Sequence, residues 1–244
     1  MIRFIIAASF LVIFLIVSIP LMGIVWLIGK FNPDTRDRFS LKVVQFGFGT
    51  IAKLSGVKVT EIGKEKIPEG AVLYIGTHRS YFDIVLLYTL ADRLTGFVSK
   101  KSMTKFPVVN WWMRFVYCLF LDRDDPKQGL KTILTAAEYI KKGISICIFP
   151  EGTRNKSKDL NILPFKEGSF KIATKTGCPI IPIAINNTSA IFEDHMPCLR
   201  KTHVIIEYCD PIYPNELSKD EKKHIGEMCH KIVQDAVNRN AALV

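Results

Sequence analysis

The amino-acid sequence predicts an α/β fold with a single domain, in which helices on both faces cover a mostly parallel or mixed sheet. Apolar runs of strand length alternate with segments that have helical spacing, a pattern typical of such sheets. Several runs are apolar without alternation, as expected of strands buried on both faces. An uncharged stretch and then a segment with helical apolar spacing come first, so we expect a hydrophobic helix and an amphipathic helix before the sheet.

The hydrophobic helix is expected within residues 4–28, which contain no charge. A helix of that length extends roughly 37 Å, compared with about 30 Å of bilayer hydrocarbon. It can therefore span a membrane with tilt, or bend at Pro20 and Gly23 into a hairpin within one leaflet. The segment is too long for the apolar region of a signal peptide, and no cleavage motif follows it. We therefore expect a membrane anchor.

Charges on either side of this segment predict its orientation. Only Arg3 precedes it, whereas Lys30, Arg36, Arg38 and Lys42 follow in quick succession. The positive-inside rule then places the rest of the chain at the cytoplasmic face of the cell membrane. The six cysteines form no C-x-x-C pair, which suits reduced thiols in that compartment, and the histidines do not have zinc-ligand spacing. We expect no metal and no cofactor.

Two further segments could either pack on the protein body or contact the membrane. Residues 39–56 carry Leu41, Val44, Phe48 and Ile51 at helical spacing, which fits either a helix packed on the body or an interfacial helix on the bilayer. An aromatic group fits either core packing or a patch among lipid headgroups. Its members are Trp111, Trp112, Phe115 and Tyr117.

The body after residue 56 reads as a regular alternation of strands and helices. Strands are expected at 57–63, 71–75, 96–99, 144–149, 179–185 and 202–208. Helices are expected at 80–90, 131–143, 167–177 and 216–238. No repeat or second domain boundary interrupts this pattern, so one domain at 57–244 follows a membrane-binding segment at 1–56.

The formal net charge of +10 restricts the partners. Nucleic acid, an anionic membrane surface and a phosphorylated substrate could each explain a basic chain. The lysines are scattered, with no nucleic-acid-binding motif and no basic run with interleaved aromatics. The sequence therefore favours an anionic membrane surface and a phosphorylated substrate, and no nucleic acid.

Two polar clusters follow directly on expected buried strands, at residues 76–83 and 150–155. Open α/β sheets bind ligands beyond the carboxyl ends of their strands, so the clusters form a candidate site. In the first, His78 lies in a loop and Asp83 in the first helical turn. The carboxylate can fold back onto Nδ1 of the imidazole, fixing the tautomer and leaving Nε2 to take a proton.

Each cluster also has a structural reading. Ser80 to Asp83 fits the S-x-x-D capping pattern, and a helix cap and a catalytic role can hold together. In the second cluster, Arg154 offers a bidentate fork for phosphate or carboxylate. It could instead form an ordinary salt bridge with Glu151.

Four ordered blocks together resemble the glycerolipid acyltransferases, and most closely the bacterial 1-acyl-sn-glycerol-3-phosphate acyltransferases. The resemblance extends over about residues 40–210. The blocks are the HxxxxD motif of His78 and Asp83, Lys100-Lys101 with Pro107, Phe149-Pro150-Glu151-Gly152-Thr153-Arg154, and Ile181-Pro182. The second block departs mildly, with lysine-lysine-serine where many relatives have an acidic residue. On this resemblance, residues 57–244 are expected to form the acyltransferase domain.

The resemblance implies a role for each matched residue. His78 is the general base that deprotonates the sn-2 hydroxyl of the acceptor, and Asp83 orients its ring. The acceptor site comprises Glu151, Gly152, Thr153 and Arg154, with Arg123 as a further ligand of the phosphate. Lys100 lies near the reacting carbonyl or the phosphate, and Lys101 is the weaker candidate. Ile181-Pro182 is structural.

The expected reaction is acyl transfer from a thioester, acyl-ACP or acyl-CoA, to lysophosphatidic acid, which makes phosphatidic acid for phospholipid biosynthesis. No G-x-S-x-G elbow is present, so the substrate hydroxyl serves as the nucleophile. One alternative is an acyltransferase acting on glycerol-3-phosphate or another lysophospholipid. Another is a non-catalytic lipid-phosphate binding protein, which would not need a base.

Overall fold

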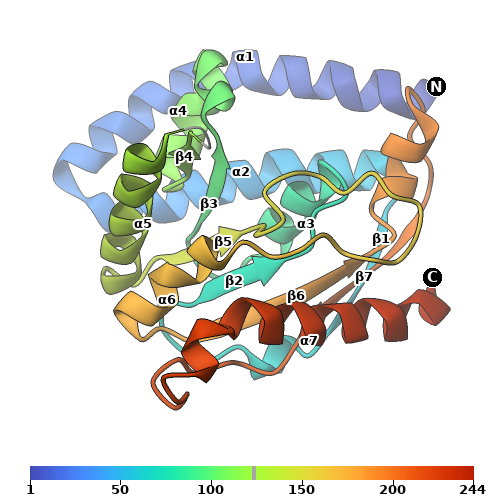
Figure 1. Ribbon diagram of the computed structural model, residues 1–244. Helices are drawn as coiled ribbons and strands as arrows, with labels where there is room; N and C mark the ends of the chain where they lie inside the picture. Colours follow the sequence, from blue (N-terminus) through green and yellow to red (C-terminus); the bar gives the residue numbers. More distant parts are fainter. Residues whose placement is uncertain (123–124) are drawn as a thin grey trace.

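A computed structural model describes residues 1–122 and 125–244 (Figure 1). Within those residues, seven strands form one mixed sheet in the order β1-β7-β6-β2-β5-β3-β4. All neighbouring strands are parallel except β6 and β7, so β1 and β7 run opposite to the rest. The strands are β1 (Lys58–Ile62), β2 (Leu73–Gly76), β3 (Thr95–Lys100), β4 (Leu119–Leu121), β5 (Ser145–Ile148), β6 (Ile180–Asn186) and β7 (His203–Tyr208).

Helices cover both faces of this sheet, as the sequence predicted, and the α/β fold class is confirmed. One face packs against α5, α6 and α7, and the other against α2 and α3. The helices are α1 (Ile2–Phe31), α2 (Pro33–Ser55), α3 (Phe82–Leu90), α4 (Pro107–Phe115), α5 (Pro126–Lys141), α6 (Lys171–Thr176) and α7 (Ile225–Asn240).

The continuous apolar runs of the sequence are explained by this two-sided burial. In β5, Ile146 and Ile148 join the core under α5, α6 and α7, whereas Cys147 between them joins the core under α3. Successive side chains of a strand point to opposite faces, so a strand between two helical layers needs apolar residues at every position. Every residue of β6 is buried.

The first two helices form an antiparallel hairpin that leaves one side of α1 uncovered. Asn32 ends α1 and caps α2, because its side-chain oxygen accepts a hydrogen bond from the Thr35 amide at 2.9 Å. Helix α1 continues through Pro20 and is long and apolar enough to cross a membrane, by length and composition alone. Most of its side chains are exposed, while Met22 and Val25 are buried with Trp112 of α4.

The apolar stripe of the amphipathic segment faces the protein body. Leu41, Val44, Phe48 and Ile51 of α2 are partly buried against the core that also contains α3. These four side chains therefore pack on the body, as the first of the two readings expects, and contact of α2 with a bilayer stays a prediction.

Several elements differ from the sequence expectation at their ends. Helix α5 begins at Pro126 instead of 131, because Asp125 caps it by accepting hydrogen bonds from Lys127 and Gln128 amides. The last helix begins at Ile225 instead of 216. Helix α4 and the short strand β4 were not predicted. In α4, Trp112 is buried, as the core-packing reading expects, whereas Trp111 is 57% exposed, and a place for Trp111 among lipid headgroups stays a prediction.

Candidate functional site

The carboxyl ends of four strands bring the two polar clusters together. His78 follows β2 and the Phe149–Arg154 segment follows β5, and these strands are hydrogen-bonded neighbours in parallel. On the other side of β2, β6 ends at Asn186, and β3 ends at Lys100 beside β5. The loops are joined directly, because the Asn155 amide donates to the His78 carbonyl at 2.7 Å. This edge is where an open α/β sheet binds ligands.

His78 and Asp83 lie in contact at this edge. Nδ1 of His78 is 2.8 Å from Oδ2 of Asp83. A carboxylate can only accept a hydrogen bond, so this contact fixes the proton of the neutral ring on Nδ1 and leaves Nε2 as the acceptor. The imidazole also stacks on Phe149, with ring centroids 4.3 Å apart and an interplanar angle of 13°. The ring is therefore held in one plane and in one tautomer.

Asp83 combines the capping and orienting roles that the sequence left open. Oδ2 also accepts hydrogen bonds from the Arg79 and Ser80 amides, each at 2.8 Å, which joins the start of α3 to the loop. Oδ1 accepts a hydrogen bond from the Thr188 hydroxyl at 2.5 Å. Asp83 is fully buried. Because the donors come from the backbone of the loop and from a buried threonine, the fold sets the orientation of the Asp83 carboxylate toward His78.

Glu151 forms no salt bridge with Arg154, which corrects the structural reading of the second cluster. One of its oxygens accepts from the His78 amide at 2.8 Å and the other from the Leu163 amide at 3.1 Å. Burial raises the pKa of the Glu151 carboxyl, and the hydrogen bonds from the two amides oppose that rise. Glu151 thus holds the backbone of the His78 loop.

Arg154 is paired with a residue that the sequence reading missed. Its guanidinium lies 3.3 Å from Oε1 of Glu193, which is in the segment after β6. It also donates to the Tyr81 hydroxyl at 3.0 Å and stacks 3.8 Å from the centroid of that ring. Glu193 in turn accepts from the Ser80 hydroxyl at 2.7 Å and the Tyr81 amide at 2.8 Å. No local sequence signal pointed to Glu193, because its partners are more than 35 residues away.

Arg79, next to His78, fixes the long loop beyond Arg154. Its guanidinium donates to the carbonyl oxygens of Ser157, Asp159 and Asn161, at 2.8, 2.8 and 3.0 Å. The two polar clusters are therefore linked by side chains as well as by backbone. The guanidinium of Arg79 therefore holds this loop through its hydrogen bonds to the three carbonyl oxygens.

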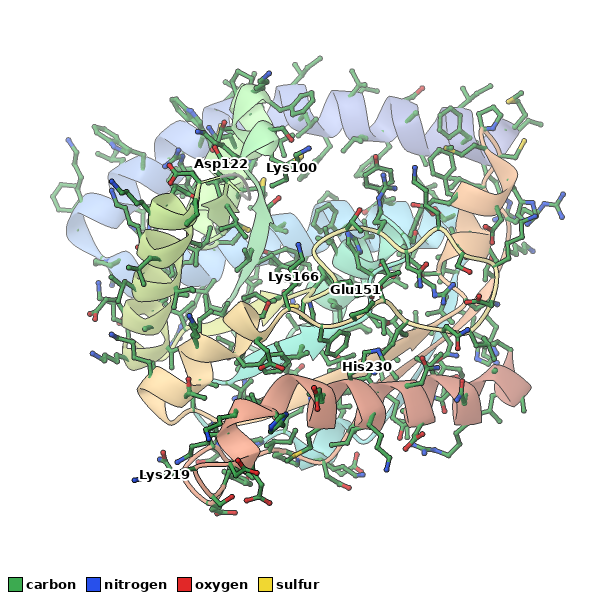
Figure 2. All side chains as sticks on the ribbon, viewed as in Figure 1. Lys100, Asp122, Glu151, Lys166, Lys219 and His230 are labelled. Carbon is green, nitrogen blue, oxygen red and sulfur yellow. The ribbon has the colours of Figure 1, made fainter. Side chains whose placement is uncertain are left out.

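The remaining predicted residues lie around the same edge. Gly152 has a φ of +72°, a conformation that favours glycine, and Thr153 is exposed. Lys100 ends β3 and is exposed, whereas Lys101 is paired with Asp122 at 2.9 Å. Figure 2 shows Lys100 on the side of the sheet nearest α1, with Glu151 closer to the sheet. Arg123 lies outside the described residues.

This arrangement can accept a proton at Nε2 of His78 and bind an anion beside it. No described residue hydrogen-bonds to that nitrogen, and the 152–154 loop is joined to the His78 backbone through Glu151, which accepts from the His78 amide. Within residues 1–122 and 125–244, no three His, Cys, Asp or Glu side chains gather as a metal site.

Comparisons with known proteins agree on one family. A family model described as "Acyltransferase" matches residues 58–186. The 1-acyl-sn-glycerol-3-phosphate acyltransferase of Salmonella typhimurium is 32% identical over 228 residues, covering 91% of each chain. The Escherichia coli protein of that name is 33% identical over 200 residues, covering 80% of each. The yeast (Saccharomyces cerevisiae) protein of that name is 30% identical over 184 residues, which span 75% of this chain and 60% of the yeast chain.

A solved structure is similar over nearly the whole chain. It is the crystal structure of the 1-acyl-sn-glycerophosphate (LPA) acyltransferase PlsC from Thermotoga maritima, with a TM-score of 0.80 and 25% identity. The similarity covers 99% of this chain and 97% of that one, so it includes the N-terminal helices as well as the sheet.

Proposed function

This chain belongs to the acyltransferase family, and we propose that it transfers a fatty acyl group to the sn-2 hydroxyl of 1-acyl-sn-glycerol-3-phosphate, making phosphatidic acid. The membership confirms the resemblance predicted from the four ordered blocks. The chain is an enzyme of phospholipid biosynthesis, not a binding protein alone. The observation that best supports a catalytic role is the contact of buried Asp83 with Nδ1 of His78, which leaves Nε2 free to accept a proton.

His78 is the general base of this reaction. Nε2 takes the proton of the acceptor hydroxyl as its oxygen attacks the carbonyl carbon of the thioester. The carbon–sulfur bond then breaks, and the thiolate leaves with the proton that His78 returns. Asp83 is a positioning residue, since it stabilises the imidazolium that forms and, by accepting from Nδ1, keeps Nε2 free to take the proton. No acyl-enzyme is needed because the nucleophile belongs to the substrate.

The acceptor phosphate is bound by the loop from Gly152 to Arg154. The guanidinium of Arg154 is oriented before substrate arrives by Glu193 and by the Tyr81 ring. An arginine held in this way loses little rotamer freedom when it binds a phosphate. Glu151 contributes by holding the His78 loop, since its two oxygens already accept amide hydrogen bonds. Lys100, at the end of β3, is the candidate cation for the reacting carbonyl.

The donor is an acyl thioester carried on acyl carrier protein or on coenzyme A. Both carriers are acidic, and a chain with a formal net charge of +10 attracts either. Both are also cytoplasmic, which agrees with the positive charges that follow α1.

Attachment to the membrane occurs through the uncovered side of α1, with the body on one face of the bilayer. Helix α1 contacts the body near its start, where Phe4 stacks on Phe192 at 5.5 Å, and from its middle onward, where the Trp112 indole donates to the Ser18 hydroxyl at 2.9 Å and packs with Met22 and Val25. A helix held to a polar body along its length cannot cross the bilayer and keep those contacts. Its exposed isoleucines and valines therefore enter one leaflet, with the body on the cytoplasmic side.

A reconstituted assay tests this function. Purified full-length protein in anionic vesicles is given 1-acyl-sn-glycerol-3-phosphate, glycerol-3-phosphate or lysophosphatidylcholine, with acyl donors on each carrier. We expect phosphatidic acid from the first acceptor and much slower transfer to the others. Faster acylation of another acceptor would show that the assigned substrate is wrong, and no transfer with any pair would contradict the catalytic assignment.

A further inference from the structure

Lys166 lies against the loop that contains Gly152. Its backbone amide donates to the Pro150 carbonyl at 3.1 Å, which brings the residue alongside the segment after β5. A Cβ built on Gly152 would be 2.9 Å from Nζ of Lys166 and 3.1 Å from its Cε. In this conformation the ammonium therefore lies in the space that a side chain at position 152 would enter. In Figure 2 the Lys166 side chain lies next to Glu151, and its amino end points toward the side where Lys100 lies.

The Lys166 ammonium has no ionic partner in the described part of the chain. No hydrogen bond or salt bridge joins it to another described residue, and the residue is exposed. The nearby guanidinium groups differ in this respect. Arg154 is paired with Glu193, and Arg79 donates to three backbone carbonyls. Lys166 is thus a free cation beside the catalytic loop.

The site around His78 contains several carboxylates, so binding an anionic phosphate there requires additional positive charge. Asp83, Glu151 and Glu193 are carboxylates within the hydrogen-bonded network of the site. A phosphate monoester carries about −1.5 to −2 charges at neutral pH. Two arginines offset part of that total, but Arg154 already faces Glu193 and Arg79 donates to three backbone carbonyls. A further cation next to Gly152 would restore the balance where the phosphate lies.

We propose that Lys166 is a binding residue for the phosphate of the acceptor, acting together with Arg154 from the other side of Gly152. This inference rests on the proposed function, because it assumes a phosphorylated acceptor. It adds a residue outside the four sequence blocks. The glycine has two purposes here: it adopts the left-handed turn, and its missing side chain lets the ammonium approach the loop.

Kinetics with each substrate varied in turn test this role in the full-length enzyme. Lys166→Met keeps the apolar stem over Gly152 and removes the charge. We expect its KM for 1-acyl-sn-glycerol-3-phosphate to rise roughly 10- to 100-fold, the usual range for one lost charge-assisted hydrogen bond, with kcat and the donor KM nearly unchanged. Lys166→Arg should recover much of the loss. Lys175→Met is the control, since Lys175 is an exposed lysine of α6.

Each other outcome is decisive. Wild-type kinetics for Lys166→Met, or a loss equal to that of the control, would overturn the proposal while leaving the proposed function intact. A rise confined to the donor KM would assign the cation to the donor's phosphates and overturn the acceptor role. A lower melting temperature with both substrates affected alike would show a structural role instead. Failure of the wild-type enzyme to acylate this acceptor would refute the proposed function itself.

Discussion

The Thr188 hydroxyl donates a hydrogen bond to Oδ1 of Asp83 at 2.5 Å, across 105 residues of sequence. Both groups are fully buried. The other carboxylate oxygen faces His78 at 2.8 Å, so Thr188 fixes the carboxylate from the side opposite the imidazole. The strand that leads to Thr188, β6, is the direct neighbour of the strand that leads to His78, β2.

Replacing Thr188 tests this arrangement. Thr188→Val leaves a buried carboxylate oxygen without its donor, and a lost hydrogen bond to a charged group is worth about 1.5–3 kcal/mol. We expect kcat to fall roughly tenfold or more, with KM for both substrates little changed. Thr188→Ser retains the hydroxyl and should retain most of the rate. Equal rates for the valine and serine enzymes would show that this hydrogen bond does not affect catalysis.

Removing the base should abolish most turnover without unfolding the protein. His78→Ala is expected to lower kcat by roughly 10²–10⁴-fold, the usual contribution of general base catalysis. Asp83→Asn should also lower the rate, but it removes an acceptor of two amides at the start of α3 and should lower the melting temperature as well. A folded His78→Ala enzyme with nearly normal activity would contradict the mechanism.

Arg154 and Glu193 should give different defects. Arg154→Ala is expected to raise the KM for the phosphorylated acceptor strongly, with little change in the donor KM, and Arg154→Lys should recover only part of it because an ammonium has no bidentate fork. Glu193→Gln should raise the acceptor KM less and also lower stability, since Glu193 holds Ser80 and Tyr81. Substrate-varied kinetics and thermal melts distinguish the two. Donor and acceptor affinity falling equally in Arg154→Ala would argue against phosphate binding.

The buried Glu151 predicts a pH-dependent stability difference. Burial raises the pKa of this carboxyl above its ordinary value of 4.5, so folding favours the protonated form. Its contribution to stability is therefore fully present below pH 4.5 and is lost as the pH rises through the raised pKa. Glu151→Gln cannot ionise, so its melting temperature relative to the wild type should increase between pH 4 and pH 8. A difference that is constant with pH would contradict the raised pKa.

Vesicle binding should depend on the exposed side of α1. Ile16 and Val17 are 60% and 61% exposed, and glutamate at both places a charge in the surface that we expect to enter lipid. Ile16→Glu with Val17→Glu should reduce co-flotation with anionic vesicles while leaving the melting temperature close to that of the wild type. Tyr213→Glu, at an exposed site outside α1, is the matched control. Unchanged co-flotation of the α1 variant would exclude this surface as the attachment.

Local patterns were sufficient to predict the elements that carry the site. The apolar runs before His78 and before Phe149 predicted β2 and β5, because a strand buried on both faces requires apolar residues at every position. The HxxxxD spacing put Asp83 in the first turn of the helix after the His78 loop, from which its carboxylate can fold back onto the imidazole. Helix α4 and strand β4 were not predicted, and β4 has only three residues, too few for alternation to be distinguished from a loop.

Partners far apart in the sequence were decided only by the tertiary structure. The sequence by itself determined that His78, Asp83 and Arg154 follow buried strands. It could not determine that Arg154 pairs with Glu193 and not Glu151, or that Thr188 completes the Asp83 network. Those contacts depend on β6 lying beside β2, and strand order is set by how all the helices and strands bury their apolar faces together. The same packing decides that the apolar face of α2 lies against the protein body. An amphipathic pattern specifies that one face of a helix is covered but not what covers it.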